Sequence, residues 1–163
     1  MIKKIILAVL LIATVLWLGF IFSNSLDTAE QSSEKSSTVS EVVNKVAEKV
    51  GIEEEIPEKT IREMAHFSEF ALLSVLICAD IAVFLTLVSP RSLYTRSTCV
   101  FLSLPVCSLL AFVDELLQKT SDGRASQLSD VLLDTLGATC GVLASLTIYI
   151  ICDLLIKRKL RKS

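Results

Sequence analysis

Long apolar segments alternate with shorter polar segments along the chain, and this pattern predicts four membrane-spanning helices. The apolar segments cover about residues 5–23, 64–88, 97–117 and 131–156. Each is near or above the roughly 20 residues that a helix needs to cross a bilayer. A helix of a soluble bundle carries a polar face, and residues 5–22 and 142–152 have almost no polar positions. The pattern therefore favours an all-α integral membrane bundle of four transmembrane helices over a soluble bundle.

The polar segment between the first two spans, residues 24–63, has a helical periodicity of its own. Valine recurs on one stripe, at Val39, Val42, Val43, Val46 and Val50. The stripe predicts a short amphipathic helix over about residues 39–50, with Thr38 and Glu41 as a capping box at its start. Such a helix lies on the membrane surface or over the bundle, or it is a plain helical linker. A second capping box, "TIRE" at residues 60–63, predicts the start of the second span.

Composition supports one membrane domain over residues 1–163, with 52% hydrophobic residues and a mean hydropathy of +0.63. Lys3 and Lys4 give the chain the basic start of a secretory signal. The following apolar run is longer than a signal core, however, and no A-x-A-like site follows it, so we interpret it as a retained anchor. The five cysteines all lie in apolar segments without a CxxC motif, which indicates neither a disulfide framework nor a zinc site.

The distribution of charge predicts the orientation in the membrane. With four spans both chain ends lie on one side, and that side holds nine of the 16 basic residues, Lys3, Lys4, Arg91, Arg96, Lys157, Arg158, Lys159, Arg161 and Lys162. Flanks rich in Lys and Arg remain in the cytoplasm. We therefore expect both termini to be cytoplasmic, and residues 24–63 and 118–130 to face outward.

Three spans carry polar groups at the ends that this topology places outside. These groups are Arg62, His66 and Glu69 on the second span, Asp114, Glu115 and Gln118 on the third, and Asp130 and Asp134 on the fourth. On the second and fourth spans they are three or four residues apart and so share a face, and on the third Asp114 and Glu115 lie four and three residues before Gln118. Gly137, Gly141 and Ser145 follow Asp134 as a ladder of small residues, which permits close helix packing. We expect the acids to face the bundle interior near the outer interface.

Two interpretations of this polar group stay open on the residues alone. Arg62 and Arg124 can pair with the acids in an ion network that locks the helices together. Alternatively the group lines a functional cleft, because ionisable side chains at membrane depth are costly and normally mark a site. His66 is the single histidine of the chain, and a lone histidine can simply be a satisfied hydrogen-bonding group.

Taken in order, these motifs resemble the VanZ-like family of small bacterial membrane proteins. The resemblance rests on "REMAHFSEF" at 62–70, "DELLQ" at 114–118, Gly123 with Arg124, and "DVLLDTLGATCG" at 130–141. The polar "FSNSLDTAEQSS" after the first span is similar as well. Glu63 stands where the family usually has Lys, and Phe70 where it usually has Tyr. The resemblance implies a place in the bacterial cell membrane and a role in the cell envelope, without supplying a reaction. The family is named for a protein that raises resistance to teicoplanin, a lipid-bearing glycopeptide antibiotic, so a link to such resistance is a candidate here.

The first candidate function is an enzyme that acts on a lipid-linked substrate at the outer interface. His66 is the candidate general acid or base, because imidazole exchanges protons near neutral pH, and Glu69 would orient it. Asp114 and Glu115 complete the catalytic set, since repulsion between neighbouring carboxylates favours keeping one proton available. The candidate substrate-binding residues are Arg62, Gln118, Arg124, Asp130 and Asp134, with Arg124 holding a phosphate or carboxylate.

The second candidate is a non-catalytic protein that binds an amphiphile or a lipid headgroup. The expected partners are the lipid bilayer and a lipid-linked envelope precursor or a lipoglycopeptide, and nucleic acid is not expected. No cofactor and no metal ligand are assigned. A divalent cation held by Asp114, Glu115, Asp130 and Asp134 is an alternative, because hard cations prefer carboxylate oxygens.

Overall fold

The computed structural model describes the whole chain except residues 52–53, 89–94, 124–126 and 162–163. Its described residues form five helices and no strand, which are α1 (Ile2–Ser25), α2 (Ala29–Lys49), α3 (Glu58–Val88), α4 (Thr95–Lys119) and α5 (Leu128–Leu160). Four of them, α1, α3, α4 and α5, are long and apolar enough to cross a membrane. The predicted all-α bundle of four spanning helices is confirmed, and α2 is the extra helix in the first connection.

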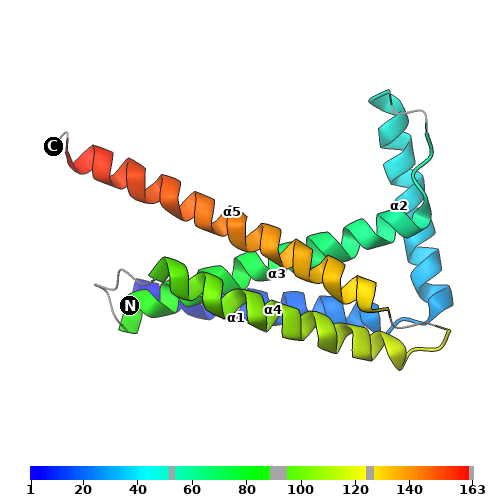
Figure 1. Ribbon diagram of the computed structural model, residues 1–163, viewed down its shortest axis with the longest axis horizontal. Helices are drawn as coiled ribbons and strands as arrows, with labels where there is room; N and C mark the ends of the chain where they lie inside the picture. Colours follow the sequence, from blue (N-terminus) through cyan, green and yellow to red (C-terminus); the bar gives the residue numbers. More distant parts are fainter. Residues whose placement is uncertain (52–53, 89–94, 124–126, 162–163) are drawn as a thin grey trace.

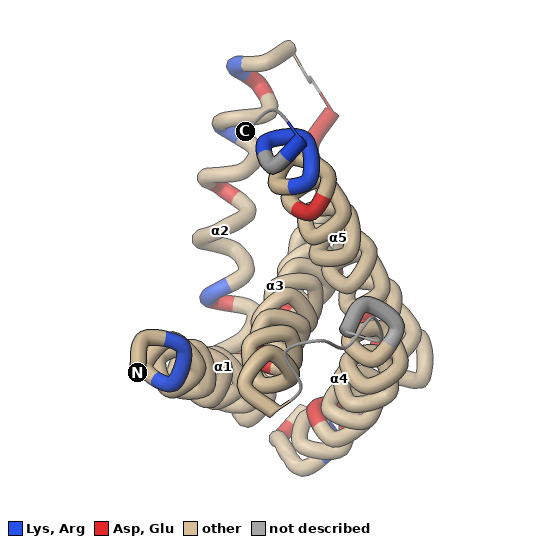
Figure 2. Tube along the Cα trace, turned by 90° about the vertical axis from the view of Figure 1, so that its left-hand side faces the viewer, with Lys and Arg blue, Asp and Glu red and all other residues tan. Residues whose placement is uncertain are grey.

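Helix α3 is the centre of the arrangement, since it contacts each of the other four helices. Helices α1, α3 and α4 run along one another, while α5 packs against α3 and α4 and then diverges (Figure 1). Helix α2 lies across one end of the bundle, which we call the α2 end. The start of α1 and the end of α5 lie at the opposite end, which we call the terminal end. Figure 2 looks onto this end and shows basic residues at the start of α1 and, apart from them, at the end of α5.

Small residues on α5 set its closest approach, which is to α3. A Cβ atom added to Gly137 would collide with the backbone carbonyl of Phe67. One added to Gly141 would collide with the carbonyl of Ala71 and the hydroxyl of Ser74. Only glycine permits this backbone contact, so the predicted close packing is confirmed at Gly137 and Gly141. Ser145, the third residue of the predicted ladder, lines a cavity instead.

The buried core lies between the helices, while most large apolar side chains face outward. Its fully buried members are Ile21, Phe70, Leu73, Cys107, Ala111 and Ala138. Phe70 stands where the VanZ-like family usually has Tyr. Its side chain is 0% exposed and fills the core. Large apolar residues of α1 and α5, such as Val15 and Leu154, are at least 60% exposed. This inverted distribution suits a bundle surrounded by lipid rather than water.

Helix α2 begins earlier than the valine stripe predicts. It runs from Ala29, and Thr28 caps it by accepting a hydrogen bond from Gln31 N while the Gln31 side chain accepts from Thr28 N. The predicted cap at Thr38 and Glu41 is wrong, because Thr38 lies inside the helix, where its hydroxyl donates to Glu34 O. The predicted helix at about 39–50 is therefore only the second half of α2. The serine-rich first half lacked an apolar stripe that would reveal it.

Helix α2 ends close to the predicted position, but α3 begins before its predicted start. Helix α2 ends at Lys49, and Gly51 has a φ of 89°, a conformation that favours glycine. Helix α3 begins at Glu58, so the predicted cap at Thr60 lies inside it and is wrong. The Asn44 side chain instead holds the connection by accepting from Ile56 N at 2.8 Å and donating to Ile56 O at 3.2 Å.

Candidate functional site

Asp114 is the most enclosed acid at the α2 end and is held by two neutral donors. It is 0% exposed, in the last turns of α4. The hydroxyl of Ser25, the last residue of α1, lies 2.5 Å from its Oδ1 atom. Gln118, one turn further along α4, donates from Nε2 to its Oδ2 atom at 3.0 Å. These two contacts hold the Asp114 side chain in place between α1 and α4.

His66 and Glu69 face each other on α3. His66 Nδ1 and Glu69 Oε2 are 3.8 Å apart, an ion-pair distance rather than a hydrogen bond, and their side chains are 17% and 14% exposed. Asn24 of α1 donates to the other carboxylate oxygen of Glu69 at 3.2 Å. Trp17 donates from its indole nitrogen to the Glu69 backbone carbonyl at 3.0 Å. Glu69 is thus fixed from α1 and lies beside the imidazole, and its role in orienting His66 stays a prediction.

Asp134 reaches the same place from α5. It is only 1% exposed, and its Oδ1 atom is buried without a hydrogen bond to any described residue. The possible ligand atoms of His66, Asp114 and Asp134 all lie within 4.8 Å of one another. Their meeting follows from the packing, because Gly137 lies one turn after Asp134 and presses on Phe67, the neighbour of His66. We call these three residues with Glu69 the polar cluster.

Glu115 lies next to Asp114 in the sequence, but its hydrogen bond is to the start of α5 and not to the polar cluster. Its Oε1 atom accepts a hydrogen bond from the backbone N–H of Gln127 at 2.5 Å. Gln127 is the N-cap residue of α5, whose first backbone donors have no partner within the helix. This contact supports a role for Glu115 in fixing the start of α5, beside its predicted catalytic role.

The connection between α4 and α5 is also tied to the start of α2. Ser121 donates from its hydroxyl to Ser25 O at 3.1 Å, and Ala29 N donates to Asp122 O at 3.0 Å. Gly123 has a φ of 76°, and a Cβ atom there would approach the Ala29 side chain to 3.1 Å. Glycine is therefore required at this turn. Arg124, the predicted anion-binding residue beside it, lies outside the described residues.

Two cavities open on His66 and Arg62. The first, of about 140 Å³, is lined by both residues together with Gln118, Gln127 and Asp130. We call it the polar cavity. The second, of about 530 Å³, is lined by residues of α1, α2 and α3, among them Asn24, Glu69, Arg62 and His66. We call it the α2 cavity. Arg62, Gln118 and Asp130, all predicted to bind substrate, therefore share a cavity wall with His66.

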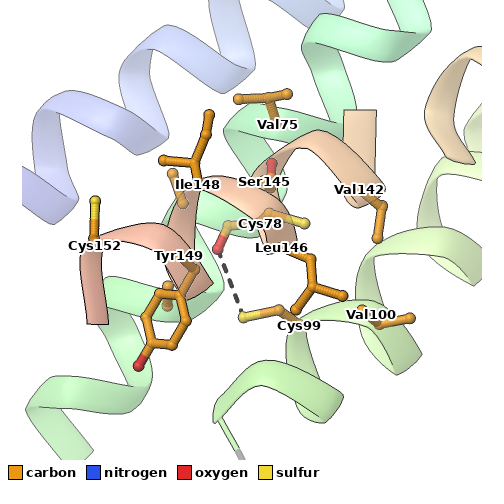
Figure 3. A pocket seen from close by; sticks show the side chains of 12 residues that line it. Val75, Cys78, Cys99, Val100, Val142, Ser145, Leu146, Ile148, Tyr149 and Cys152 are labelled. Carbon is orange, nitrogen blue, oxygen red and sulfur yellow. Dashed lines mark hydrogen bonds between the residues drawn. The ribbon is translucent and has the colours of Figure 1, made fainter. Parts of the chain in front are cut away.

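A third cavity, of about 290 Å³, lies toward the terminal end between α3, α4 and α5. Figure 3 shows its walls, formed by Val75, Cys78, Val100, Val142, Leu146 and Tyr149 among others. Its only drawn polar contact is Cys99 Sγ to Cys78 O at 3.8 Å. We call it the apolar pocket. Sequence reasoning missed it, because cysteines and small residues inside a span look like ordinary packing.

Sequence reasoning also missed the part that α1 plays in the site. Trp17, Asn24 and Ser25 hold the acids of α3 and α4. The signal was present in "FSNS", whose asparagine and second serine are polar residues at the end of an otherwise apolar helix. From the sequence alone, these residues indicate only where the first span ends, and not that their side chains contact acids on other helices.

The fold and the cluster together define a class of protein, a helical membrane protein with four candidate spans and a buried polar site at one end. The family model for VanZ/LLP1 matches residues 10–151, and the chain belongs to this family. The match extends from α1 to α5 and contains every residue of the polar cluster. No curated protein and no solved structure matches the chain.

Proposed function

We propose that this VanZ/LLP1 protein acts, in the bacterial cell envelope, on the polar head of a lipid-linked or amphiphilic substrate. The observation that carries the proposal is the position of His66. It lies beside buried Asp114 and Asp134 and on the walls of both the polar cavity and the α2 cavity. A group that exchanges protons is thereby placed where a headgroup can reach it from solvent.

The charges of the polar cluster favour a working site over a structural ion network. A network that only locks helices pairs its acids with bases. Among the described residues no Lys or Arg lies within 4.0 Å of a carboxylate oxygen of Asp114 or Asp134. Arg62 forms no ion pair within that part of the chain and lines both cavities instead. Acids at membrane depth that have no basic partner among the described residues are better explained by function than by a structural network.

The two ends of the bundle divide the recognition of an amphiphile between them. The polar cluster and Arg62 face the headgroup, and the apolar pocket accepts part of its hydrocarbon chain. Both lie along α3 and α5, which connect His66 and Asp134 to Cys78 and Tyr149. The substrate class is therefore a lipid-linked envelope precursor or a lipoglycopeptide.

The proposed orientation places the α2 end outside the cell and both termini in the cytoplasm. Its support is the basic start of α1 and the basic end of α5, which lie at one end of the bundle (Figure 2). A membrane-impermeant maleimide should label a Ser33→Cys variant in intact cells but leave a Ser163→Cys variant unlabelled, both on a background without native cysteines. Labelling of the Ser163→Cys variant alone would reverse the orientation.

Turnover tests the proposed function directly. Purified protein is incubated with extracted envelope lipids, and the lipids are compared by mass spectrometry with those treated with a His66→Ala variant. A product formed only by the wild type supports an enzyme. In cells, expression should raise tolerance to teicoplanin and not to a glycopeptide that lacks a lipid chain, and His66→Ala should abolish the difference.

A second candidate, a non-catalytic amphiphile-binding protein, is favoured by α2. Val39, Val42, Val46 and Val50 are each at least 50% exposed along one stripe. This stripe and the α2 cavity offer an apolar surface beside the acids, which suits an amphiphile with an amine group. Saturable binding of teicoplanin without any product, unchanged by His66→Ala, would select this function over the enzyme.

A further inference from the structure

The polar cluster brings together three possible metal ligands from three different helices. His66 of α3, Asp114 of α4 and Asp134 of α5 present ligand atoms within 4.8 Å of one another. Bonds of about 2.0–2.2 Å to a transition-metal ion place its ligand atoms roughly 3–4.4 Å apart. The observed group is only slightly wider than such a shell, so small side-chain rotations would close it.

Asp134 independently indicates that a positive partner belongs in this space. Its side chain is 1% exposed, and no described residue donates to its buried Oδ1 atom. A carboxylate removed from water is costly unless it is paired, bound to a metal or protonated, and a bound metal ion would supply the partner that this oxygen lacks. Asp114 and Glu69 add further negative charge within the same cluster, and no described Lys or Arg lies within 4.0 Å of any of the three carboxylates.

The surroundings of the ligands also match those of bound metals. Ser25 and Gln118 each donate to one oxygen of Asp114, at 2.5 and 3.0 Å, and so fix its orientation. Glu69 lies 3.8 Å from His66 Nδ1, the place of the carboxylate in carboxylate–histidine–metal arrangements. Such neighbours orient metal ligands and raise their affinity.

We propose that His66, Asp114 and Asp134 bind a divalent transition-metal ion of the Mn²⁺–Zn²⁺ series. A ligand set with one imidazole nitrogen and two carboxylate oxygens suits these ions better than Ca²⁺, which takes oxygen ligands alone. This set differs from the four carboxylates considered from the sequence. Glu115 binds Gln127 N, and Asp130 lines the polar cavity. Three protein ligands leave positions open for water or a substrate oxygen, as in catalytic rather than structural sites.

The inference deepens the proposed function, since the ion would lie in the same site, but its test uses the metal alone. Full-length protein in detergent is stripped with EDTA, and the binding of Zn²⁺ and of Mn²⁺ is measured by calorimetry and by elemental analysis. We expect about one ion per chain. Asp134→Asn and His66→Gln should weaken binding by at least the roughly 10–100-fold typical of lost outer-shell partners, and Gln118→Ala by an amount within that range.

Asp130→Asn is the matched control, because it removes one acid from α5 one turn before Asp134. Its affinity should fall by no more than about threefold, the effect of a screened charge. Without metal, Asp134→Asn should melt at or above the wild-type temperature, and only wild type and Asp130→Asn should melt higher when metal is added. No stoichiometric binding by the wild type, or equal losses in Asp130→Asn and Asp134→Asn, would overturn the metal site. The lipid-turnover assay tests the proposed function separately, because it measures product formation and not metal binding.

Discussion

The two ends of the helical bundle differ in what lies between their helices, which is a group of polar side chains at one end and an apolar cavity at the other. At the α2 end, close helix packing forces acids from α3, α4 and α5 together, and neutral donors from α1 hold them. At the terminal end, α5 leaves the bundle and an apolar pocket lies between α3, α4 and α5 (Figures 1 and 3). The same helices therefore supply a polar site at one end and an apolar space at the other.

Residue size on α5 accounts for this difference. Gly137 and Gly141 allow backbone contact with α3 at the α2 end, whereas Leu146 and Tyr149 follow toward the terminal end and line the pocket. Bulky side chains hold the helices apart, and glycines let them meet. The position of the small residues along α5 thus determines which end becomes the polar site.

The largest expected effect separates the polar residues of the two ends. His66→Gln should reduce turnover of the lipid substrate by about 10²–10⁴-fold, the usual contribution of a general acid or base. Asp80→Asn should leave turnover near the wild-type value. Asp80 lies toward the terminal end and accepts from the Thr14 hydroxyl at 2.7 Å, and an amide oxygen can accept equally well. Rates are measured on purified variants at equal protein concentration. Equal losses in both variants would show that the two ends do not differ in function.

The next effect tests the packing that creates the cluster. Gly141→Ala should destabilise the bundle by about 1–3 kcal/mol, because the added Cβ collides with Ala71 O and the backbones must separate. That corresponds to a melting temperature lower by about 2–4 °C for each kcal/mol. Gly19→Ala is the control, since nothing lies within 4 Å of its added Cβ. It should raise stability by up to about 1 kcal/mol through helix propensity. A Gly141→Ala variant as stable as Gly19→Ala would contradict the role of the ladder.

A smaller effect concerns the apolar pocket. Ser145→Leu places a larger side chain on its wall and should weaken binding of a long-chain amphiphile several-fold, while a short-chain analogue with the same headgroup binds as before. The loss is modest because the surrounding lipid also solvates the displaced chain. Leu143→Phe, at a position 56% exposed outside the pocket, should change neither affinity. Equal weakening of the binding of both analogues would show that the apolar pocket does not bind the hydrocarbon chain.

The smallest effect concerns α2. Thr28→Ala should cost about 1 kcal/mol of local helix stability through loss of the cap, and it should speed amide exchange at residues 29–33. Thr38→Ala, inside the same helix, should leave exchange unchanged or slow it, because alanine is the better helix former. Hydrogen–deuterium exchange resolves the two segments. Faster exchange in the Thr38→Ala variant alone would instead support the prediction from the valine stripe, in which Thr38 caps the start of the helix.

The apolar segments and helical spacing were sufficient to predict the four spans and the inward direction of the acids. Asp114 and Asp134 are buried as expected, and Gly137 and Gly141 meet α3 as expected. These predictions succeeded because each depends on periodicity within one helix. The first half of α2 was missed for the same reason, since its stability comes from the cap at Thr28 and not from an apolar stripe.

Contacts between helices could not be predicted with the same success. That Glu115 binds Gln127 N, or that Ser25 and Asn24 serve acids on other helices, depends on rotations that no spacing within one segment reports. The packing of α3 against α4 and α5 places His66, and not Asp130, close to both Asp114 and Asp134. No spacing within one segment indicates this. Local patterns indicated the chemistry of the residues, and packing determined which of them meet.

The divergence of α5 has a consequence for how any affinity of this protein should be expressed. The apolar pocket lies between helices of a bundle whose large apolar side chains face outward, so a hydrocarbon ligand as proposed here would arrive from the bilayer and not from bulk water. Its effective concentration is then the mole fraction in the membrane, which depends on partitioning and on the amount of lipid present. An apparent dissociation constant in aqueous units should rise in proportion to added empty vesicles, while the same data plotted against ligand per lipid should fall on one curve.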